Sequence, residues 1–442
     1  MNTKTSRLPC ESVHAFAVAP SAWSLIWQAA LLLLFAQAAL GQAGESDWPQ
    51  WRGPTRDSKI GDPATWPKDL SGLSTSWRVE LGPSYSGPIV GGDRVFVTET
   101  HDKRDEVVRA LDRRTGSEIW RTSWKGAMSV PFFARRNGDW IRSTPAYDGQ
   151  SLFVAGMRDV LICLDAETGA ERWRVDFPAT RKTPVPSFGF VCSPLVIGDY
   201  VYVQAGGAFV KLDKHSGKEV WQTLKDGGGM DSAFSSPVLA TLHGELQLVV
   251  QMRQKLAGVR PENGEVLWSQ VVPSYRGMNI LTPTVFENGV FTSSHKNKTF
   301  FYRVTSNGSG YGVSEEWTTP GQGYMSSPVV IGHHAYLHLG NGRLCCVDLK
   351  EGKELWRSKP LGEYWSMVSN GNRILALNQN GELLLMAANP KKFRLLDRRE
   401  VAEAESWAHL AVCGDELFVR DLQGLTAFRW ENRPAAVDGK SP

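Results

Sequence analysis

The sequence predicts an all-β chain, an eight-bladed β-propeller of four-stranded antiparallel blades. Two short motifs recur along the 442 residues. Together they fill a period of roughly forty to fifty residues, which is typical of propellers and solenoids. The last repeat ends one strand short, and a lone strand precedes the first repeat. We therefore expect the two ends of the repeats to share one sheet and to close the ring.

The first motif is an apolar residue and Asp, followed by Gly four positions later and Trp four positions after that. The Asp carboxylate can accept bonds from turn N–H groups two or three residues on. Gly supplies the positive φ of a short loop, and the residues up to the Trp alternate as in a return strand. Each copy therefore predicts a hairpin with Trp at its far end. The copies are LDRRTGSEIW (111–120), LDAETGAERW (164–173), LDKHSGKEVW (212–221), VDLKEGKELW (347–356) and, without the Asp, VRPENGEVLW (259–268).

The second motif is a small polar residue and Pro, followed by two short β-rich runs around a Gly-containing turn. Pro lacks an N–H, so it is tolerated at the start of an edge strand, and we expect that strand to line the central channel. The two motifs together give four strands in each unit, A to D from the channel outward, as in a propeller blade. The prolines stand at 88, 145, 194, 237, 283 and 328, and copies without Pro span 366–377 and 408–419.

Closure is predicted from the two ends of the repeats. The eighth unit stops after its third strand, at LTAFRW (425–430), and STSWRVELG (74–82) precedes the first unit as an isolated strand D. Pairing the two segments would complete the eighth blade and remove the open edges of the ring.

The Asp-x-x-x-Gly-x-x-x-Trp copies resemble the Trp-docking PQQ repeat of quinoprotein alcohol dehydrogenase-like propellers, over about residues 74–430. The family contains dehydrogenases and non-catalytic scaffolds alike, and this chain looks similar to secreted members that act as outer-membrane-assembly scaffolds. The resemblance implies that one Trp from each unit packs between neighbouring blades. These residues are Trp77, Trp120, Trp173, Trp221, Trp268, Trp317 and Trp356.

The flanking segments predict an extracytoplasmic protein. Residues 1–43 hold a basic start, an apolar run over 22–40 and small residues, as in a secretory signal peptide, and an uncleaved anchor is the alternative. Residues 44–73 are expected to form a Trp-rich strap over the side of the propeller, and the tail 431–442 is expected to be disordered. The mature chain would be periplasmic or secreted, with no stable membrane span.

Charge and cysteine usage exclude two classes. Removing residues 1–43 takes away Lys4, Arg7 and Glu11, which lowers the net charge from +3 to +2. That value is too near neutral for a dedicated nucleic-acid binder. An odd number of cysteines would remain, scattered over strands, which is no disulfide framework. The adjacent Cys345 and Cys346 lie within one expected strand, so they should point to opposite faces as core residues.

One face of the ring carries basic and aromatic residues. The D–A and B–C loops share that side, and basic groups among aromatics at a channel mouth suit an anion, a carboxylated cofactor or an acidic peptide. Ordinary solvated turns are the alternative interpretation. The candidate ligand-binding residues are Arg142, Arg276, Tyr324, Trp365, Arg158 and Arg343.

Two functions follow from the resemblance. The first is a binding or assembly scaffold with protein partners in the cell envelope, acting as a monomer without a cofactor. The second is a small dehydrogenase that binds PQQ and calcium. The family's enzymes need a Trp floor, a Ca²⁺ held by carboxylate and amide side chains, and a catalytic Asp, and no stretch matches these. No catalytic residue is therefore assigned. His333 and His334 sit in a turn without a carboxylate at ligand spacing along the chain, so no metal site is predicted.

Overall fold

The computed structural model describes residues 47–61, 68–226 and 233–430, with Arg136 and Asn137 described by their backbone alone. These residues belong to one compact unit, Gly41–Pro442, and a second unit comprises Met1–Leu40. The expected signal peptide over 1–43 and the expected tail over 431–442 lie outside the described residues. None of the helices in the described part of the chain has the length and hydrophobicity of a membrane span.

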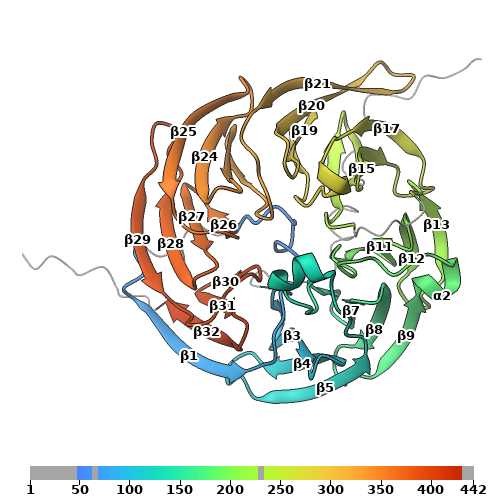
Figure 1. Cartoon of the computed structure of the whole chain (residues 1–442), viewed down its shortest axis with the longest axis vertical. Coiled ribbons are helices and arrows are strands. Elements are labelled where there is room, and N and C mark those ends of the chain that lie inside the picture. The colour runs from blue at the N-terminus through green and yellow to red at the C-terminus, as the bar shows by residue number, and fades with distance from the viewer. Residues whose placement is uncertain (1–46, 62–67, 227–232, 431–442) are drawn as a thin grey trace, which may run out of the picture. The chain divides into compact units, whose positions relative to one another are not determined.

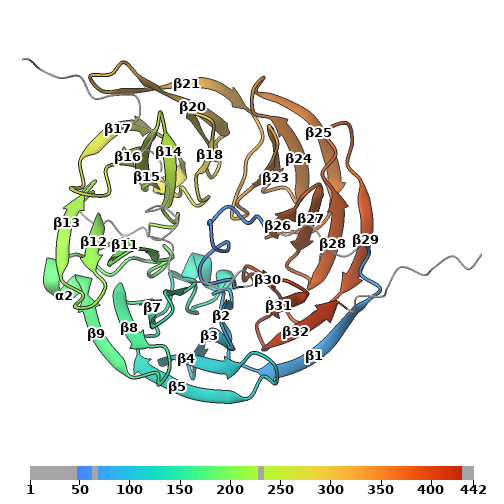
Figure 2. The ribbon, with the colours of Figure 1, turned by 180° about the vertical axis from the view of Figure 1, so that it is seen from behind.

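The described chain forms eight four-stranded antiparallel sheets around a central channel, as the repeats predicted (Figure 1, Figure 2). The strands, sheet by sheet, are β2 (Ile89–Gly91), β3 (Arg94–His101), β4 (Asp105–Asp112) and β5 (Glu118–Lys125); β6 (Ala146–Tyr147), β7 (Ser151–Gly156), β8 (Val160–Asp165) and β9 (Glu171–Asp176); β10 (Leu195–Ile197), β11 (Tyr200–Ala205), β12 (Ala208–Asp213) and β13 (Glu219–Thr223); β14 (Val238–Leu242), β15 (Glu245–Gln251), β16 (Lys255–Val259) and β17 (Val266–Val271); β18 (Thr284–Phe286), β19 (Gly289–Ser293), β20 (Thr299–Ser306) and β21 (Tyr311–Thr319); β22 (Val329–Ile331), β23 (His334–His338), β24 (Arg343–Asp348) and β25 (Lys353–Pro360); β26 (Ser366–Asn370), β27 (Arg373–Leu377), β28 (Glu382–Ala387) and β29 (Leu395–Glu400); and β30 (Ala411–Cys413), β31 (Glu416–Arg420), β32 (Gly424–Trp430) and β1 (Leu73–Glu80).

The eighth sheet joins the two ends of the repeats. Strand β1 pairs antiparallel with β32, in a register that sets Leu73 opposite Trp430 and Trp77 opposite Ala427. The expectation that an N-terminal strand closes the ring is confirmed, and the strand begins at Leu73, one residue before the expected start. The first and last strands of the ring are thus held by backbone bonds to each other.

The two faces of the ring are built from different connections. We call the side that bears the D–A and B–C loops the upper face, and the side that bears the A–B and C–D turns the lower face. Three short helices lie in D–A loops: η2 (Phe132–Asn137), α2 (Phe177–Arg181) and η3 (Tyr275–Gly277). Figure 1 views the upper face, where η2 crosses the centre of the ring.

Most of the repeat tryptophans bind the next sheet. Trp120 donates its Nε1–H to the carbonyl of Ala166, 3.1 Å away, and its ring covers Gly169 of the following C–D turn. A Cβ on Gly169 would meet that ring at 2.5 Å, and the φ of 74° also requires glycine. The Gly of one repeat therefore receives the Trp of the repeat before it. The same bond joins Trp77 to Arg113, Trp173 to Lys214, Trp221 to Pro261, Trp317 to Leu349 and Trp356 to Asn389.

Trp268 departs from this arrangement. Its Nε1–H donates to Gln247 Oε1 of its own sheet, 2.8 Å away, although its ring still packs among Val290 and Phe300 of the next sheet. The next sheet offers no Asp-x-x-x-Gly turn, because its outer hairpin runs on until Ser306 pairs with Tyr311. The motif needs a receiving turn as well as a Trp.

The adjacent cysteines lie on opposite sides of strand β24. Cys345 packs in the cluster that contains Phe301 of the preceding sheet, and Cys346 packs in the cluster that contains Met386 of the following sheet. Both thiols are buried. The expectation that they point to opposite faces is confirmed.

The sequence led us to expect the Trp-rich strap over the side of the propeller, and this expectation is wrong. Residues 47–60 run inside the central channel, where Figure 2 shows them as the blue segment at the centre of the ring. Trp48 exchanges backbone bonds of 2.9 Å with Val90 on β2, and Ile60 N–H donates to Ser369 O on β26 at 2.9 Å. The strap therefore enters along the first sheet and leaves along the seventh.

Two buried arginines explain the course of the strap. The inner edge of every strand A lacks a partner strand, so its inward carbonyl groups need donors from elsewhere. Arg56 donates to Pro194 O at 2.7 Å and to Ser193 O at 3.0 Å, and Arg52 donates to Pro328 O. A guanidinium group carries several N–H donors in one plane. Two arginine side chains therefore supply hydrogen bonds to inner carbonyl groups at the third and sixth sheets.

Candidate functional site

The channel opens on the upper face into a cavity of about 510 Å³, which we call the mouth cavity. It lies where the D–A loops converge on the starts of the inner strands. The described residues that line it are mostly aromatic, basic or sulfur-containing: Trp51, Tyr85, Phe133, Arg142, Phe188, Phe234, Tyr275, Arg276, Met278, His295, Lys296, Tyr324, Met325 and Trp407, with Ala134, Val191, Ser193, Ser236, Ile280 and Thr282.

Trp51 of the strap contributes to the cavity from the channel side. Its Nε1–H donates to Thr282 Oγ1 at 3.0 Å, and its ring meets His409 edge-on with centroids 5.0 Å apart. Sequence reasoning missed this residue at the site, because it assigned the strap to the side of the propeller. The signal was present in the two tryptophans of DWPQWRG, which are too large and apolar for an exposed linker.

A chain of aromatic contacts runs around the upper end of the channel. Ring centroids 4–7 Å apart in offset or tilted arrangements are the favourable geometry for such pairs. The closest contacts are those of Trp407, whose ring lies 4.0 Å from Tyr364 and stacks on Tyr85 at 4.6 Å. The chain continues through Tyr364–Tyr324 at 5.9 Å, Tyr324–His295 at 4.6 Å and His295–Tyr275 at 6.1 Å.

Arg142 brings a fixed positive charge to this wall. It donates to Gly138 O at 2.9 Å and to Trp140 O at 3.3 Å, and its guanidinium stands 5.6 Å from the centre of the Tyr85 ring. Burial lowers the pKa of Arg142 to about 10, so the group remains protonated at neutral pH. The carbonyl bonds orient the charge without neutralising it.

Arg276 and Lys296 carry two further charges. The Arg276 guanidinium lies 5.6 Å from the Tyr275 ring centre and 5.6 Å from that of Phe133, and Lys296 Nζ lies 4.3 Å from Tyr275. Both basic residues have a left-handed backbone, with φ of 53° and 54°. Such strained positions are uncommon outside glycine and concentrate at functional sites.

Exposed aromatic residues extend the site outward along η2. Phe132 is 80% exposed and Phe133 is 60% exposed, and their rings form an edge-on pair with centroids 5.7 Å apart. Tyr275 is also exposed, on η3 across the cavity. Exposed aromatic groups beside a cavity are the usual composition of a surface that binds another molecule.

The donor set of the mouth cavity does not suit calcium. Among the described lining residues there is no Asp, Glu, Asn or Gln. Ca²⁺ takes its protein ligands from carboxylate and carbonyl oxygens, and the quinoprotein enzymes also need an Asp at the reacting centre. The cations and aromatic rings would accept a planar carboxylated ring, but they do not fit the PQQ–calcium pair.

The structure brings together half of the site residues expected from sequence. Arg142, Arg276 and Tyr324 line the mouth cavity. The expectation that Trp365 faces the mouth is wrong, because this side chain is 3% exposed and stacks on His338 with centroids 4.8 Å apart. Neither Arg158 nor Arg343 lines the cavity.

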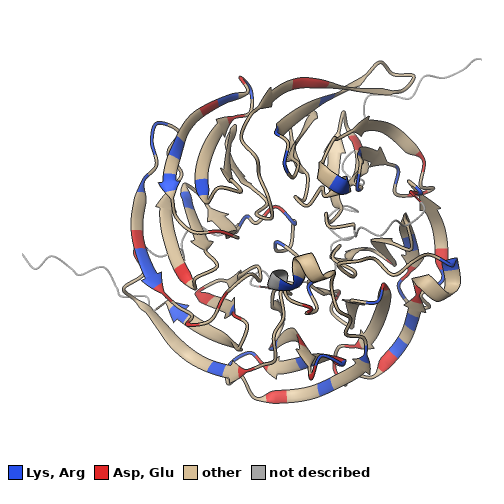
Figure 3. Cartoon of the chain, in the orientation of Figure 1, with Lys and Arg blue, Asp and Glu red and all other residues tan. Residues whose placement is uncertain are grey.

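The position of the B–C loops explains why Arg158 and Arg343 do not line the cavity. Strands B and C are the second and third from the channel, so their loop stands farther from the axis than the D–A loops. Arg158 is exposed in such a loop, and Arg343 donates to Ser358 O of its own sheet at 2.8 Å. Figure 3 shows Lys and Arg spread over the ring as a whole. Charge is therefore not confined to the cavity, and basic side chains also lie over aromatic rings elsewhere, as Arg181 does over Phe177. The cavity differs in that several such pairs, including those of Arg142 and Arg276, line one space.

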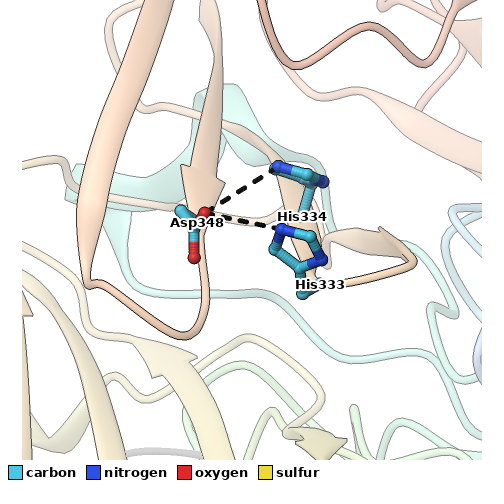
Figure 4. A group of neighbouring side chains, drawn as sticks. All are labelled: His333, His334 and Asp348. Atoms are coloured by element: carbon cyan, nitrogen blue, oxygen red, sulfur yellow. Dashed lines mark ion pairs between the residues drawn. The ribbon is translucent and has the colours of Figure 1, made fainter.

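A cluster of two histidines and a carboxylate lies on the lower face, where spacing along the chain did not predict it. His333 Nε2 lies 3.6 Å and His334 Nε2 lies 3.9 Å from Asp348 Oδ2 (Figure 4). The ligand atoms of the three residues all lie within 4.8 Å of one another. The sequence offers no carboxylate at ligand spacing along the chain, and the structure brings Asp348 to the two histidines from the neighbouring strand instead. The antiparallel register sets His334 on β23 directly opposite Asp348 on β24.

Comparison with known proteins places the chain. The family model described as outer membrane protein assembly factor BamB, of the PQQ repeat type, matches residues 104–358. The chain belongs to this family. It is 24% identical over 272 residues to the outer membrane protein assembly factor BamB of Yersinia pestis, covering 55% of this chain and 63% of that protein. It is 29% identical over 193 residues to a polyvinylalcohol dehydrogenase of Sphingopyxis sp., covering 39% of this chain and 28% of that protein.

Solved structures of the same fold include a BamB protein and a quinohemoprotein alcohol dehydrogenase. BamB from Moraxella catarrhalis superposes with a TM-score of 0.60 at 16% identity, over 82% of this chain and 99% of that one. A quinohemoprotein alcohol dehydrogenase from Pseudomonas putida superposes with a TM-score of 0.62 at 14% identity, over 92% of this chain and 82% of that one. Similarity at this level of sequence identity establishes the propeller fold alone. The activity has to be inferred from the residues of the site. The chain spans less than two thirds of the length of both curated relatives named above.

Proposed function

We propose that this chain is a non-catalytic propeller scaffold of the cell envelope, which holds an acidic, aromatic segment of a partner protein in its mouth cavity. Membership of the BamB family supports this proposal, and it suggests that the scaffold takes part in outer membrane protein assembly. The observation that carries the proposal is the composition of the cavity, where aromatic rings and cations meet and the described lining residues include no carboxylate.

A peptide segment matches the cavity in chemistry. Phe133, Tyr275 and Tyr324 offer ring faces to apolar or aromatic side chains, and such residues dominate the energetics of protein interfaces. Arg142, Arg276 and Lys296 surround these rings with positive charge, and carboxylates of the segment would complement them. Exposed Phe132 would extend the contact beyond the cavity.

A small quinoprotein dehydrogenase is the second candidate. The relation to the polyvinylalcohol dehydrogenase favours it, and so does the presence of cations that suit a carboxylated ring. The missing carboxylate and carboxamide groups among the described lining residues weigh against it, because they leave calcium without ligands and the alcohol without a base. We therefore expect no dye-linked alcohol or sugar oxidation by the purified protein supplied with PQQ and Ca²⁺. Calcium-dependent turnover would show that the protein is a dehydrogenase and would contradict the scaffold proposal.

We place this function outside the cytoplasm, with residues 1–43 as the export signal. The apolar run at 22–40 and the family's description support that location. Fractionation of cells expressing the full chain, with sequencing of the mature N-terminus, tests it. A mature protein that begins near residue 44 in an extracytoplasmic fraction agrees with the proposal, and an intact N-terminus in the cytoplasm contradicts it. Sedimentation of the same sample tests the expected monomer.

Binding is tested with a labelled peptide of alternating Glu and Phe residues, followed by fluorescence anisotropy. We expect saturable binding that weakens as salt rises, since charges more than about 8–10 Å apart are screened at physiological ionic strength. Arg276→Glu should weaken binding at least about tenfold, as expected when a charge pair at an interface becomes repulsive. The side chain is exposed, so this variant should fold normally.

The matched control is Lys218→Glu, the same charge reversal at an exposed residue of a C–D turn on the lower face. It should leave peptide binding unchanged. A Lys-Phe peptide should bind poorly, and a Glu-Ser peptide should bind more weakly than the Glu-Phe peptide because it lacks rings. Equal losses in both variants, or equal binding of the acidic and basic peptides, would contradict the assignment of the mouth cavity.

A further inference from the structure

The structure assigns a transition-metal site to the lower face of the sixth sheet, with His333, His334 and Asp348 as the ligands of one zinc-like divalent cation. Two imidazole nitrogens face a single carboxylate oxygen, at 3.6 Å and 3.9 Å (Figure 4). Two imidazoles and a carboxylate are a common protein donor set for Zn²⁺, with a fourth position left to solvent or to another ligand.

Backbone structure fixes the positions of the three residues. His334 and Asp348 are register partners at the ends of adjacent strands, so their side chains start close together. His333 stands in the two-residue loop before β23, and its carbonyl accepts a bond of 2.9 Å from Leu349 N–H. That bond ties the A–B loop to the C–D turn and holds the second imidazole beside the carboxylate.

The Asp348 carboxylate has its two oxygens committed to different tasks. Oδ1 accepts bonds from the backbone N–H groups of Lys350 at 2.9 Å and Glu351 at 3.0 Å. Oδ2 is the oxygen that faces both histidines. Such outer bonds orient a ligating side chain, and metal sites depend on them.

The distances suit a metal with little movement. Zn²⁺ binds nitrogen and oxygen at about 2.0–2.2 Å, so tetrahedral ligand atoms stand roughly 3.3–3.6 Å apart. The observed oxygen–nitrogen distances are 3.6 Å and 3.9 Å, and all three ligand atoms lie within 4.8 Å. The His333 side chain is 45% exposed and can rotate to close the remaining gap.

The second histidine distinguishes this cluster from an ordinary ion pair. On the third sheet, His215 lies 3.4 Å from Asp199 across equivalent turns of the same face, and it has no second imidazole beside it among the described residues. In the cluster, the two imidazole centroids are 4.0 Å apart. One divalent cation between the rings could bind the lone pairs of both.

The test uses the mature chain without an affinity tag. Isothermal titration with ZnCl₂ should give one saturable site, and Zn²⁺ should raise the melting temperature, because a ligand that binds the folded state stabilises it. Co²⁺ in the same site should give the strong visible absorption of tetrahedral cobalt. Ca²⁺ and Mg²⁺ should do neither, since they prefer all-oxygen sites.

Variants separate this site from incidental zinc binding. His333→Gln and His334→Gln should each weaken Zn²⁺ binding at least about tenfold, because even the loss of a residue that only orients a ligand costs about 10–100-fold. Both should keep the metal-free melting temperature nearly unchanged, because neither glutamine enters the core. His215→Gln, the matched control on the third sheet, should bind Zn²⁺ like the parent. Equal Zn²⁺ binding in His334→Gln and in the parent, or no cobalt absorption in the parent, would overturn the assignment.

Discussion

The lower and upper faces of this ring differ in how regular their connections are. On the lower face the same turn returns in the first, second, third and sixth sheets, with an Asp that accepts bonds from the backbone N–H groups two and three residues on. Asp165, for example, accepts from Glu167 N–H at 3.0 Å and from Thr168 N–H at 2.8 Å. On the upper face the D–A loops differ from one another in length and conformation, and three of them form short helices.

The difference shows that the lower connections serve packing between sheets, and it supports the proposal that the upper loops serve recognition. The repeated turns receive tryptophans from the preceding sheet, so their side chains are committed to packing. The upper loops bear exposed rings and basic residues with a left-handed backbone, features that concentrate at binding sites. A scaffold whose sheets are locked at the outer strands can vary its upper loops without changing its ring.

The largest effect should come from a tryptophan that locks two sheets. Trp120→Ala removes a buried ring and its bond to Ala166, and should lower the free energy of unfolding by about 3–5 kcal/mol. Urea unfolding measures this loss. The control is Phe132→Ala on the upper face, where an 80% exposed ring should contribute almost nothing to stability. Similar losses in both variants would erase the division between the faces.

The strap in the channel should be the next strongest support. Arg56→Met leaves the carbonyls of Pro194 and Ser193 without their charged donor, and should cost about 1.5–3 kcal/mol. The exposed Arg114→Met, in a lower-face turn, should change stability by less than about 0.5 kcal/mol. An unfolding midpoint for Arg56→Met that equals that of the parent would mean that the ring does not depend on its strap.

Two histidines in the channel wall should make the ring sensitive to acid. Burial lowers the pKa of His409 to about 3 and that of His338 to about 4, so both are neutral in the folded chain. In the unfolded chain they take up protons below about pH 6.5. Their contribution is therefore complete above that pH and is lost as the pH falls, by about 1.4 kcal/mol per pH unit for each histidine.

The pH effect is measured by urea unfolding at several pH values between about 7 and 5. His338→Gln removes one group that takes up a proton on unfolding. It should therefore reduce the slope of the free energy of unfolding against pH, even if it lowers stability at neutral pH. A slope that His338→Gln does not reduce would show that His338 is protonated in the folded state.

The smallest effect should come from a single turn of the lower face. Arg172 and the Thr168 hydroxyl and N–H hold the pKa of Asp165 well below its usual range, so the carboxylate stays ionised and bonded. Asp165→Ala should cost about 1 kcal/mol, similar to the loss of a helix cap. Its neighbour Glu167→Ala should be nearly neutral. Peptide binding at the mouth cavity should be unchanged in both, and weaker binding in Asp165→Ala would couple the two faces.

About half of the candidate site could be predicted from sequence. Arg142, Arg276 and Tyr324 were found because they stand in loops just before or beside inner strands, a relation visible in the repeat. Trp51, Phe133 and His295 were missed, since their placement depends on the strap and on loops that follow no repeat. Trp365 was misplaced because its neighbour Tyr364 turns into the left-handed region, with φ of 53°, and the following ring folds inward onto His338.

The sequence by itself determined the eight sheets, their strand order and the closure by an N-terminal strand, expected at 74–82 and found at Leu73–Glu80. Those features rest on local patterns of turn chemistry and alternation, which act within a few residues and repeat. Only the tertiary structure decided the path of the strap and the meeting of His333, His334 and Asp348. The carbonyls that Arg52 and Arg56 bind belong to the sixth and third sheets, and they face one channel only after the ring has closed. The histidines meet Asp348 through a strand register that spacing along the chain does not reveal.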